Sequence, residues 1–152
     1  LELLGDVVDD RLRIDIREKK ALAYSPRANS SFSTRWKGYG SVTLDIEVDE
    51  KKVDDAAKAI LETMANLGAK GVVAAEVERL RSAALGNAEK WRESEGFWQG
   101  VLNDAVNRPA ALDEVKDLNH WFDAATASEL NLLCKQFFAK DRASLFVAMP
   151  KK

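Results

Sequence analysis

The chain has 152 residues, and a chain of this length buries about 70% of the surface that its unfolded form exposes, so a hydrophobic core is expected. Its 23 Lys and Arg residues nearly balance 25 Asp and Glu, and the basic residues are spread along the chain, which argues against a nucleic-acid partner. No apolar run approaches the roughly 20 residues of a membrane-spanning helix, and the amino end LELLGDVVDD is too acidic for a signal peptide, so no membrane partner is expected.

The first predicted element is an amphipathic helix over residues 2–20. Leu4, Val8, Leu12 and Ile16 recur every four residues, which places them on one helix face. The adjacent acidic pairs in this helix and a later one cannot face one another, so we expect them on solvated faces: Asp9 with Asp10, and Asp54 with Asp55.

Two strands are predicted next. Residues 24–36 lack helical spacing and form an extended segment, and the sequence KGYG at 37–40 supplies a turn. The apolar residues Val42, Leu44, Ile46 and Val48 alternate with polar ones, as in a strand with one buried face.

Four helical patterns and a final strand follow. Helices are predicted over 51–67 and along a stripe from Val77 to Ala105, broken near Gly96. Trp91 and Trp98 share that stripe, which favours core packing. A short helix follows Pro109, a Thr126–Glu129 capping box begins the last helix, and residues 143–149, ASLFVAM, are predicted to be a buried strand.

This order of elements predicts an α+β fold, an antiparallel sheet with helices packed on one face. Three strands are few for so many helices, so we expect an incomplete copy of a larger layer whose other strands precede Leu1. We found no repeat or linker, and we therefore expect a single domain over residues 1–152.

The sequence contains none of the common catalytic motifs. There is no phosphate-binding glycine loop, no Gly-x-Ser-x-Gly turn and no paired-cysteine zinc signature. The lone Cys134 lies in an apolar series and is expected to be a buried thiol. The lone His120 is expected to be a packing or surface residue, and no metal site can be completed from histidines within this chain.

The segment GDVVDDRLRIDIREKKALAYSP carries a resemblance to a known family. It is similar to the carboxyl-half signature of the pitrilysin/insulinase-type zinc peptidases, the inverzincins, in which a helix bearing Arg-Glu-Lys leads through a small-residue turn into Leu-Ala-Tyr-Ser. The matching positions here are Arg17 to Lys19 and Leu22 to Ser25, and the family usually has glycine at the position of Ala21. A looser similarity extends over most of the chain.

The resemblance implies that this chain is the carboxyl-terminal, substrate-engaging domain of a zinc metalloendopeptidase. It implies that Arg17 binds the peptide substrate and that Tyr24 is catalytic, donating a hydrogen bond to the tetrahedral oxyanion. Zinc would be bound by His-x-x-Glu-His in a homologous half, in the same protein or a partner subunit, so the fragment alone would be inactive.

Two other functions are compatible with the sequence, and one stretch indicates a cellular location. A family domain that has lost its chemistry would act as a scaffold or docking module, and an unrelated helical binding module would expose the indoles of Trp91 and Trp98. The stretch ESEGFWQGVL resembles bacterial periplasmic peptidases, which favours the periplasm or cell envelope, with the cytoplasm as the alternative.

Overall fold

The computed structural model describes residues 2–33, 36, 38–139 and 142–149. The chain forms two compact units: residues Leu1–Val73 with Ala127–Lys152, and residues Ala74–Thr126. We call them the hairpin unit and the helical unit. Two compact units can belong to one domain, so the expectation of a single domain over residues 1–152 stays a prediction.

The hairpin unit is built on helix α1, Glu2–Leu12, which continues into a π-helix, η1, Arg13–Lys19. The predicted periodicity is confirmed, because Leu4, Val8, Leu12 and Ile16 are all fully buried. One part of the prediction is wrong: Asp10 is buried and forms an ion pair with Arg13 at 2.7 Å, because this face of α1 is covered rather than solvated.

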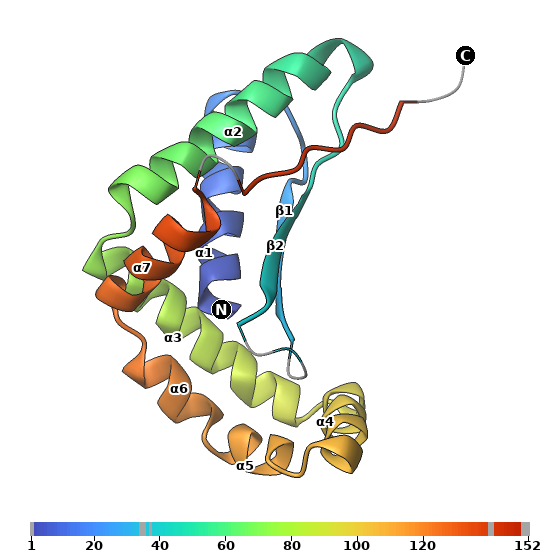
Figure 1. The fold of residues 1–152 in the computed structure, drawn as a ribbon, viewed down its shortest axis with the longest axis vertical. Helices are drawn as coiled ribbons and strands as arrows, with labels where there is room; N and C mark the ends of the chain where they lie inside the picture. The colour runs from blue at the N-terminus through green and yellow to red at the C-terminus, as the bar shows by residue number, and fades with distance from the viewer. Residues whose placement is uncertain (1, 34–35, 37, 140–141, 150–152) are drawn as a thin grey trace. The chain divides into compact units, whose positions relative to one another are not determined.

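A two-stranded antiparallel hairpin packs against α1 (Figure 1). Strand β1, Arg27–Phe32, pairs with β2, Gly40–Asp45, in a register that runs from Arg27↔Asp45 to Phe32↔Gly40. Gly5 of α1 allows the close approach, since a Cβ there would lie 2.7 Å from Ser30 Oγ. The α+β class with an antiparallel sheet is therefore confirmed.

Two further helices complete the hairpin unit. Helix α2, Val53–Lys70, follows a short 3-10 helix, η2, Glu50–Lys52, and packs beside α7, Ala127–Phe137. The amide of Asn131 in α7 bonds both backbone groups of Val72: Val72 N donates to Oδ1 at 2.7 Å, and Nδ2 donates to Val72 O at 3.2 Å. The predicted burial of Cys134 is confirmed, and Asp54 and Asp55 are exposed as expected.

The predicted buried strand over 143–149 is wrong. These residues belong to no strand in the part of the chain that the structure describes, and they are exposed. Phe146 is 91% exposed, for example. An apolar run of strand length predicts a strand only if a neighbouring strand is available to pair with it, and periodicity carries no information about that neighbour.

The helical unit contains α3, Ala74–Arg92, α4, Glu95–Asn107, α5, Ala111–Lys116, and α6, Leu118–Ala124. The predicted break in the long helical pattern comes just before Gly96, because Ser94 caps α4 by accepting a hydrogen bond from Phe97 N at 3.3 Å. The single short helix expected after Pro109 is two helices, α5 and α6.

Core packing of Trp98 is not what the structure shows. No residue of α4 is buried, and Trp98 is 40% exposed, while Trp91 is half-buried. The break before α4 ends the stripe that the two residues were expected to share. None of the helices in the described ranges is both long and apolar enough to cross a bilayer.

Candidate functional site

Arg17 lies in the last turn of the π-helix η1. Fully buried Ile16 anchors this segment, while the side chain of Arg17 is exposed. A π-helix has wider turns than an α-helix and is rare, and short π-helical turns occur frequently at functional sites. The backbone therefore fixes the point at which the Arg17 side chain leaves the helix.

A tight turn connects Arg17 to Tyr24. Ala21 has a φ of 49°, in the left-handed region, and its amide donates to Arg17 O at 3.2 Å. The next amide, of Leu22, donates to Ile16 O at 3.0 Å, and Lys52 Nζ donates to Ala21 O at 3.2 Å. The left-handed conformation explains why glycine suits this position. Alanine adopts this conformation at a conformational free-energy cost of about 1 kcal/mol relative to glycine.

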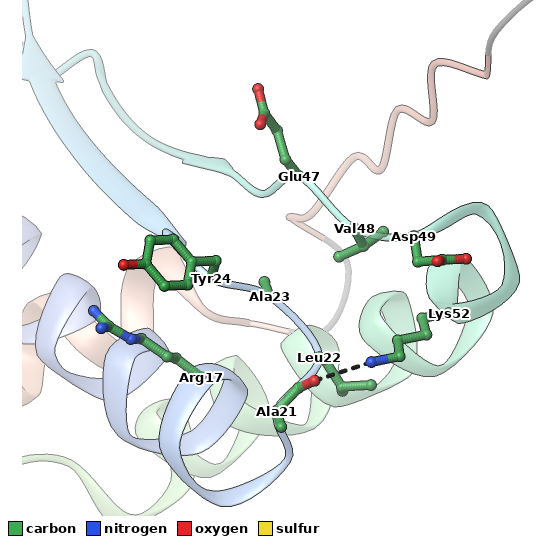
Figure 2. A pocket seen from close by; sticks show the side chains of 9 residues that line it. All are labelled: Arg17, Ala21, Leu22, Ala23, Tyr24, Glu47, Val48, Asp49 and Lys52. Atoms are coloured by element: carbon green, nitrogen blue, oxygen red, sulfur yellow. Dashed lines mark hydrogen bonds between the residues drawn. The ribbon is translucent and has the colours of Figure 1, made fainter.

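The turn brings Arg17 and Tyr24 together. Tyr24 is 80% exposed, and the Arg17 Cζ atom lies 5.0 Å from the centroid of the Tyr24 ring, as a cation–π contact requires. Both side chains line one pocket with a volume of about 500 Å³ (Figure 2). The Tyr24 hydroxyl forms no hydrogen bond with another residue of the described ranges, so it is available to a ligand.

The other wall of the pocket comes from the chain between β2 and α2. The Asp49 carboxylate accepts a hydrogen bond from Lys51 N at 2.9 Å, and the Lys52 ammonium donates one to Ala21 O. The carboxylate of Glu47 is directed away from Tyr24 (Figure 2). The Arg17 guanidinium and the Tyr24 phenol are the two side-chain donors that lie together at the aromatic ring.

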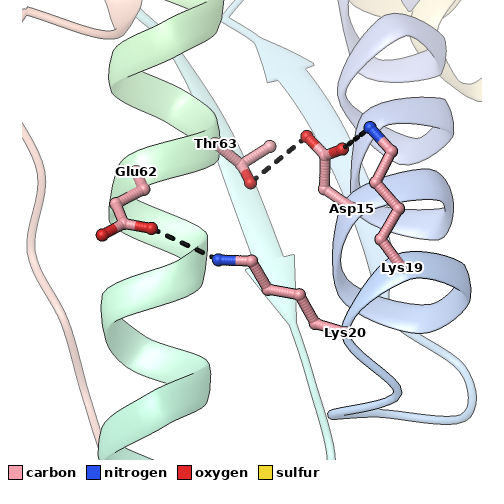
Figure 3. A network of polar contacts seen from close by, with 5 residues as sticks. All are labelled: Asp15, Lys19, Lys20, Glu62 and Thr63. Carbon is pink, nitrogen blue, oxygen red and sulfur yellow. Dashed lines mark hydrogen bonds and ion pairs between the residues drawn. The ribbon is translucent and has the colours of Figure 1, made fainter.

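A polar network fixes η1 against α2 (Figure 3). Asp15 pairs with Lys19 at 2.8 Å and accepts from Thr63 Oγ1 at 3.5 Å, and Lys20 pairs with Glu62 at 3.2 Å. The two ion pairs are solvent-accessible and therefore weak, whereas Thr63 is buried. These residues could not be predicted as a network, because only the i, i+4 spacing of Asp15 and Lys19 is visible in the sequence.

Other candidate residues lie outside this pocket. His120 is exposed, and Asp9 Oδ1 accepts a hydrogen bond from Ala28 N at 2.9 Å, which joins α1 to β1. Within the described ranges, no three His, Cys, Asp or Glu side chains are arranged to hold a metal ion. A zinc ion therefore does not fit the residues that the structure describes.

Comparison with known proteins places these features in context. The family model described as "Peptidase M16 inactive domain" matches residues 1–84, which include Arg17 and Tyr24. An uncharacterized zinc protease of Bacillus subtilis strain 168, YmxG, is 26% identical over 150 residues, and the match covers 96% of this chain and 35% of that protein. The chain thus spans about a third of this relative's length.

Two solved structures share the fold. The periplasmic protease PqqL from Escherichia coli matches 88% of this chain and 15% of its own, with a TM-score of 0.68 and 20% identity. A conserved protein from Enterococcus faecalis V583 matches 89% of this chain and 32% of its own, with a TM-score of 0.70 and 19% identity. Since the family model covers more than half of the sequence, the chain belongs to the M16 peptidase family, as the Arg-Glu-Lys and Leu-Ala-Tyr-Ser signature predicted.

Proposed function

We propose that this chain is the carboxyl-terminal domain of a zinc metalloendopeptidase, in which it binds peptide substrate and stabilises the tetrahedral intermediate. The observation that carries the proposal is the shared pocket of Arg17 and Tyr24, in which the guanidinium carbon lies 5.0 Å from the phenol ring centroid. Membership of the M16 family supports a role in peptide hydrolysis.

The two side chains have different parts in the proposed reaction. Arg17 donates hydrogen bonds to a backbone carbonyl of the substrate near the scissile bond and so orients the peptide. The Tyr24 hydroxyl donates a hydrogen bond to the oxygen of the substrate carbonyl, on which negative charge develops in the tetrahedral intermediate. A preorganised donor at this position lowers the barrier by about 3 to 4 kcal/mol.

Zinc belongs to another domain in this proposal. The metal-binding half lies elsewhere in the same protein or in a partner subunit, which agrees with a chain that spans 35% of YmxG. When bound there, zinc supplies the activated water. The 152-residue chain alone is then inactive, and Arg17 and Tyr24 act on a peptide that the other half presents.

The proposed location is the periplasm or cell envelope, supported by the fold shared with a periplasmic protease, PqqL. The cytoplasm is the alternative. Fractionation of cells that express the whole protein, followed by immunoblotting against periplasmic and cytoplasmic markers, distinguishes the two.

A scaffold role is the second candidate, favoured by the description of the matched family model as an inactive domain. That description fits a domain that lacks the metal but assists catalysis, and equally one that only docks a homologous partner. Turnover separates the two, because only the first makes the reaction depend on Arg17 and Tyr24.

The test uses the whole peptidase, with its metal-binding half. Tyr24→Phe should lower turnover by roughly a hundredfold or more, the expected loss for one oxyanion donor. Tyr39→Phe is the matched control, since Tyr39 is another exposed tyrosine, 68% exposed, and does not line the pocket. Unchanged turnover in Tyr24→Phe contradicts the catalytic role, and a zinc-loaded wild type without peptidase activity favours the scaffold.

Arg17→Gln tests substrate binding separately. Loss of the guanidinium should raise KM more than it lowers kcat, because Arg17 holds the peptide in both the ground state and the transition state. Arg27→Gln removes the same charge from an exposed position of β1 outside the pocket and should leave both constants unchanged.

A further inference from the structure

The helical unit has a cavity of its own, with a volume of about 540 Å³. It shares no lining residue with the pocket of Arg17 and Tyr24. Its wall combines apolar side chains with two cations and one amide: Trp98, Leu112, Val115, Arg92, Lys116 and Asn119. A cavity with this composition suits a ligand that is apolar at one end and anionic at the other.

The apolar end is formed around Trp98. Its indole Nε1 donates to Arg92 O at 2.7 Å, and its ring meets Phe97 edge to face with centroids 5.5 Å apart. The ring is therefore held in place although it is 40% exposed, and Leu112 beside it is 41% exposed. A fixed, exposed aromatic surface binds an apolar side chain at little cost in conformational entropy.

The anionic preference comes from Arg92. One of its amino groups donates to Val115 O at 3.1 Å, but the guanidinium forms no ion pair with another residue of the described ranges. Lys116, the other cation of the wall, is paired with the carboxylate of Asp113 at 2.9 Å. Arg92 is half-buried, and a partly desolvated cation is stabilised by a counterion.

Asn119 can complete the site. Its Oδ1 atom is shielded from solvent and has no hydrogen-bond partner. Asn119 lines the cavity, so its amide is part of the wall that a ligand meets. An oxygen in that position accepts a hydrogen bond from a peptide N–H.

We propose that this cavity is an accessory binding site for a peptide segment that carries a carboxylate next to a large apolar side chain. The carboxylate forms a bidentate pair with the Arg92 guanidinium, a geometry that suits arginine, and the apolar side chain packs on Trp98 and Leu112. The inference rests on the proposed function in one respect: a peptide is the expected ligand because the protein is proposed to bind peptide substrates. It adds which peptide sequences this second site prefers.

Isothermal titration calorimetry of the 152-residue chain with Ac-Gly-Leu-Glu-Gly-NH2 tests the site. We expect binding in the millimolar range or tighter, and about tenfold weaker binding by Arg92→Gln, the equivalent of one charge-assisted pair. The same peptide with glutamine in place of glutamate should lose affinity equally. Lys90→Gln is the matched control, because Lys90 is exposed in the same last turn of α3 and does not line the cavity.

Three results would overturn the proposal. They are no binding to the folded wild type at millimolar peptide, equal affinity of Arg92→Gln and wild type, and equal loss in Arg92→Gln and Lys90→Gln, which indicates unspecific charge attraction. Far-UV circular dichroism establishes that each variant is folded. The binding assay requires neither zinc nor turnover, so failure here and failure of the Tyr24→Phe test are separate outcomes.

Discussion

Helices α1 and α4 show that apolar composition does not decide burial. Helix α1 carries four acidic residues and an arginine, yet it buries Leu3, Leu4, Gly5, Val7, Val8, Asp10 and Leu12. Helix α4 carries only two charged residues, Glu95 and Asp104, and buries none of its residues. The hairpin covers α1, whereas no element of the helical unit fully covers a residue of α4. Burial therefore follows from the neighbours that a helix has, and matched substitutions in the two units can measure this difference.

The largest expected difference is between two leucines. Leu4→Ala removes a fully buried side chain from α1 and should lower the free energy of unfolding by about 3 kcal/mol, from lost transfer energy and a cavity. Leu102→Ala in α4, where the leucine is 56% exposed, should change it by less than about 0.5 kcal/mol. Urea unfolding followed by far-UV circular dichroism measures both, and equal losses would remove the contrast between the units.

Two asparagines give the next comparison. Asn131→Ala leaves the N–H and C=O of Val72, a residue only 4% exposed, without their side-chain partner, at an expected cost of about 1 to 3 kcal/mol. Asn119→Ala removes an amide whose buried oxygen has no partner, so the free energy of unfolding should change by less than about 0.5 kcal/mol. Hydrogen exchange of the Val72 amide should rise in the first variant only.

Two glycines should respond with opposite signs. Gly5→Ala places a Cβ 2.7 Å from Ser30 Oγ and 3.1 Å from Ser30 Cβ, so Ser30 must shift, and we expect a loss of about 1 kcal/mol or more. Gly100→Ala in α4 meets nothing within 4 Å and should stabilise by up to about 1 kcal/mol through helix propensity. Thermal unfolding gives the signs. A stabilised Gly5→Ala would show that the close approach is not constrained.

The smallest effect depends on pH. Burial, and secondarily the charge of Asp9, raise the pKa of Asp6 in α1 above its ordinary value. The folded state then disfavours the ionised carboxyl, so the free energy of unfolding falls as pH rises from the ordinary pKa through the raised one. Asp6→Asn should remove this fall and stabilise the protein at neutral pH by about 0.5 kcal/mol or less. Urea midpoints measured from pH 3 to 7 test this; parallel curves for variant and wild type would contradict it.

Much of the hairpin unit could be predicted because its signals are local. The four-residue recurrence from Leu4 to Ile16 and the alternation from Val42 to Val48 are direct consequences of helix and strand geometry. The structure limits β2 to Gly40–Asp45, shorter than the alternating run, because β1 offers ladder partners only as far as Arg27. The π-helical winding of Arg13–Lys19 left no trace in the periodicity.

The remaining errors concern what an element packs against. Residues 143–149 have the composition of a buried strand and Trp98 that of a core residue, but both predictions needed a partner that local sequence does not specify. For the site, the family signature indicated Arg17 and Tyr24, and the contacts of Lys52 with Ala21 and of Thr63 with Asp15 could not be foreseen, since 31 and 48 residues separate these pairs. Their roles in catalysis stay predictions.

The wide turns of η1 make the aim of Arg17 depend on chain length as well as on residue identity. Deleting one residue between Arg13 and Lys19 would let the segment wind as an ordinary α-helix, and each residue of such a helix turns the next by about 100°. The direction of Arg17 relative to the aromatic ring would then depend on where the residue was removed, although neither side chain had changed. The number of residues in this segment therefore matters to the contact of Arg17 with Tyr24 as well as the identity of the two side chains.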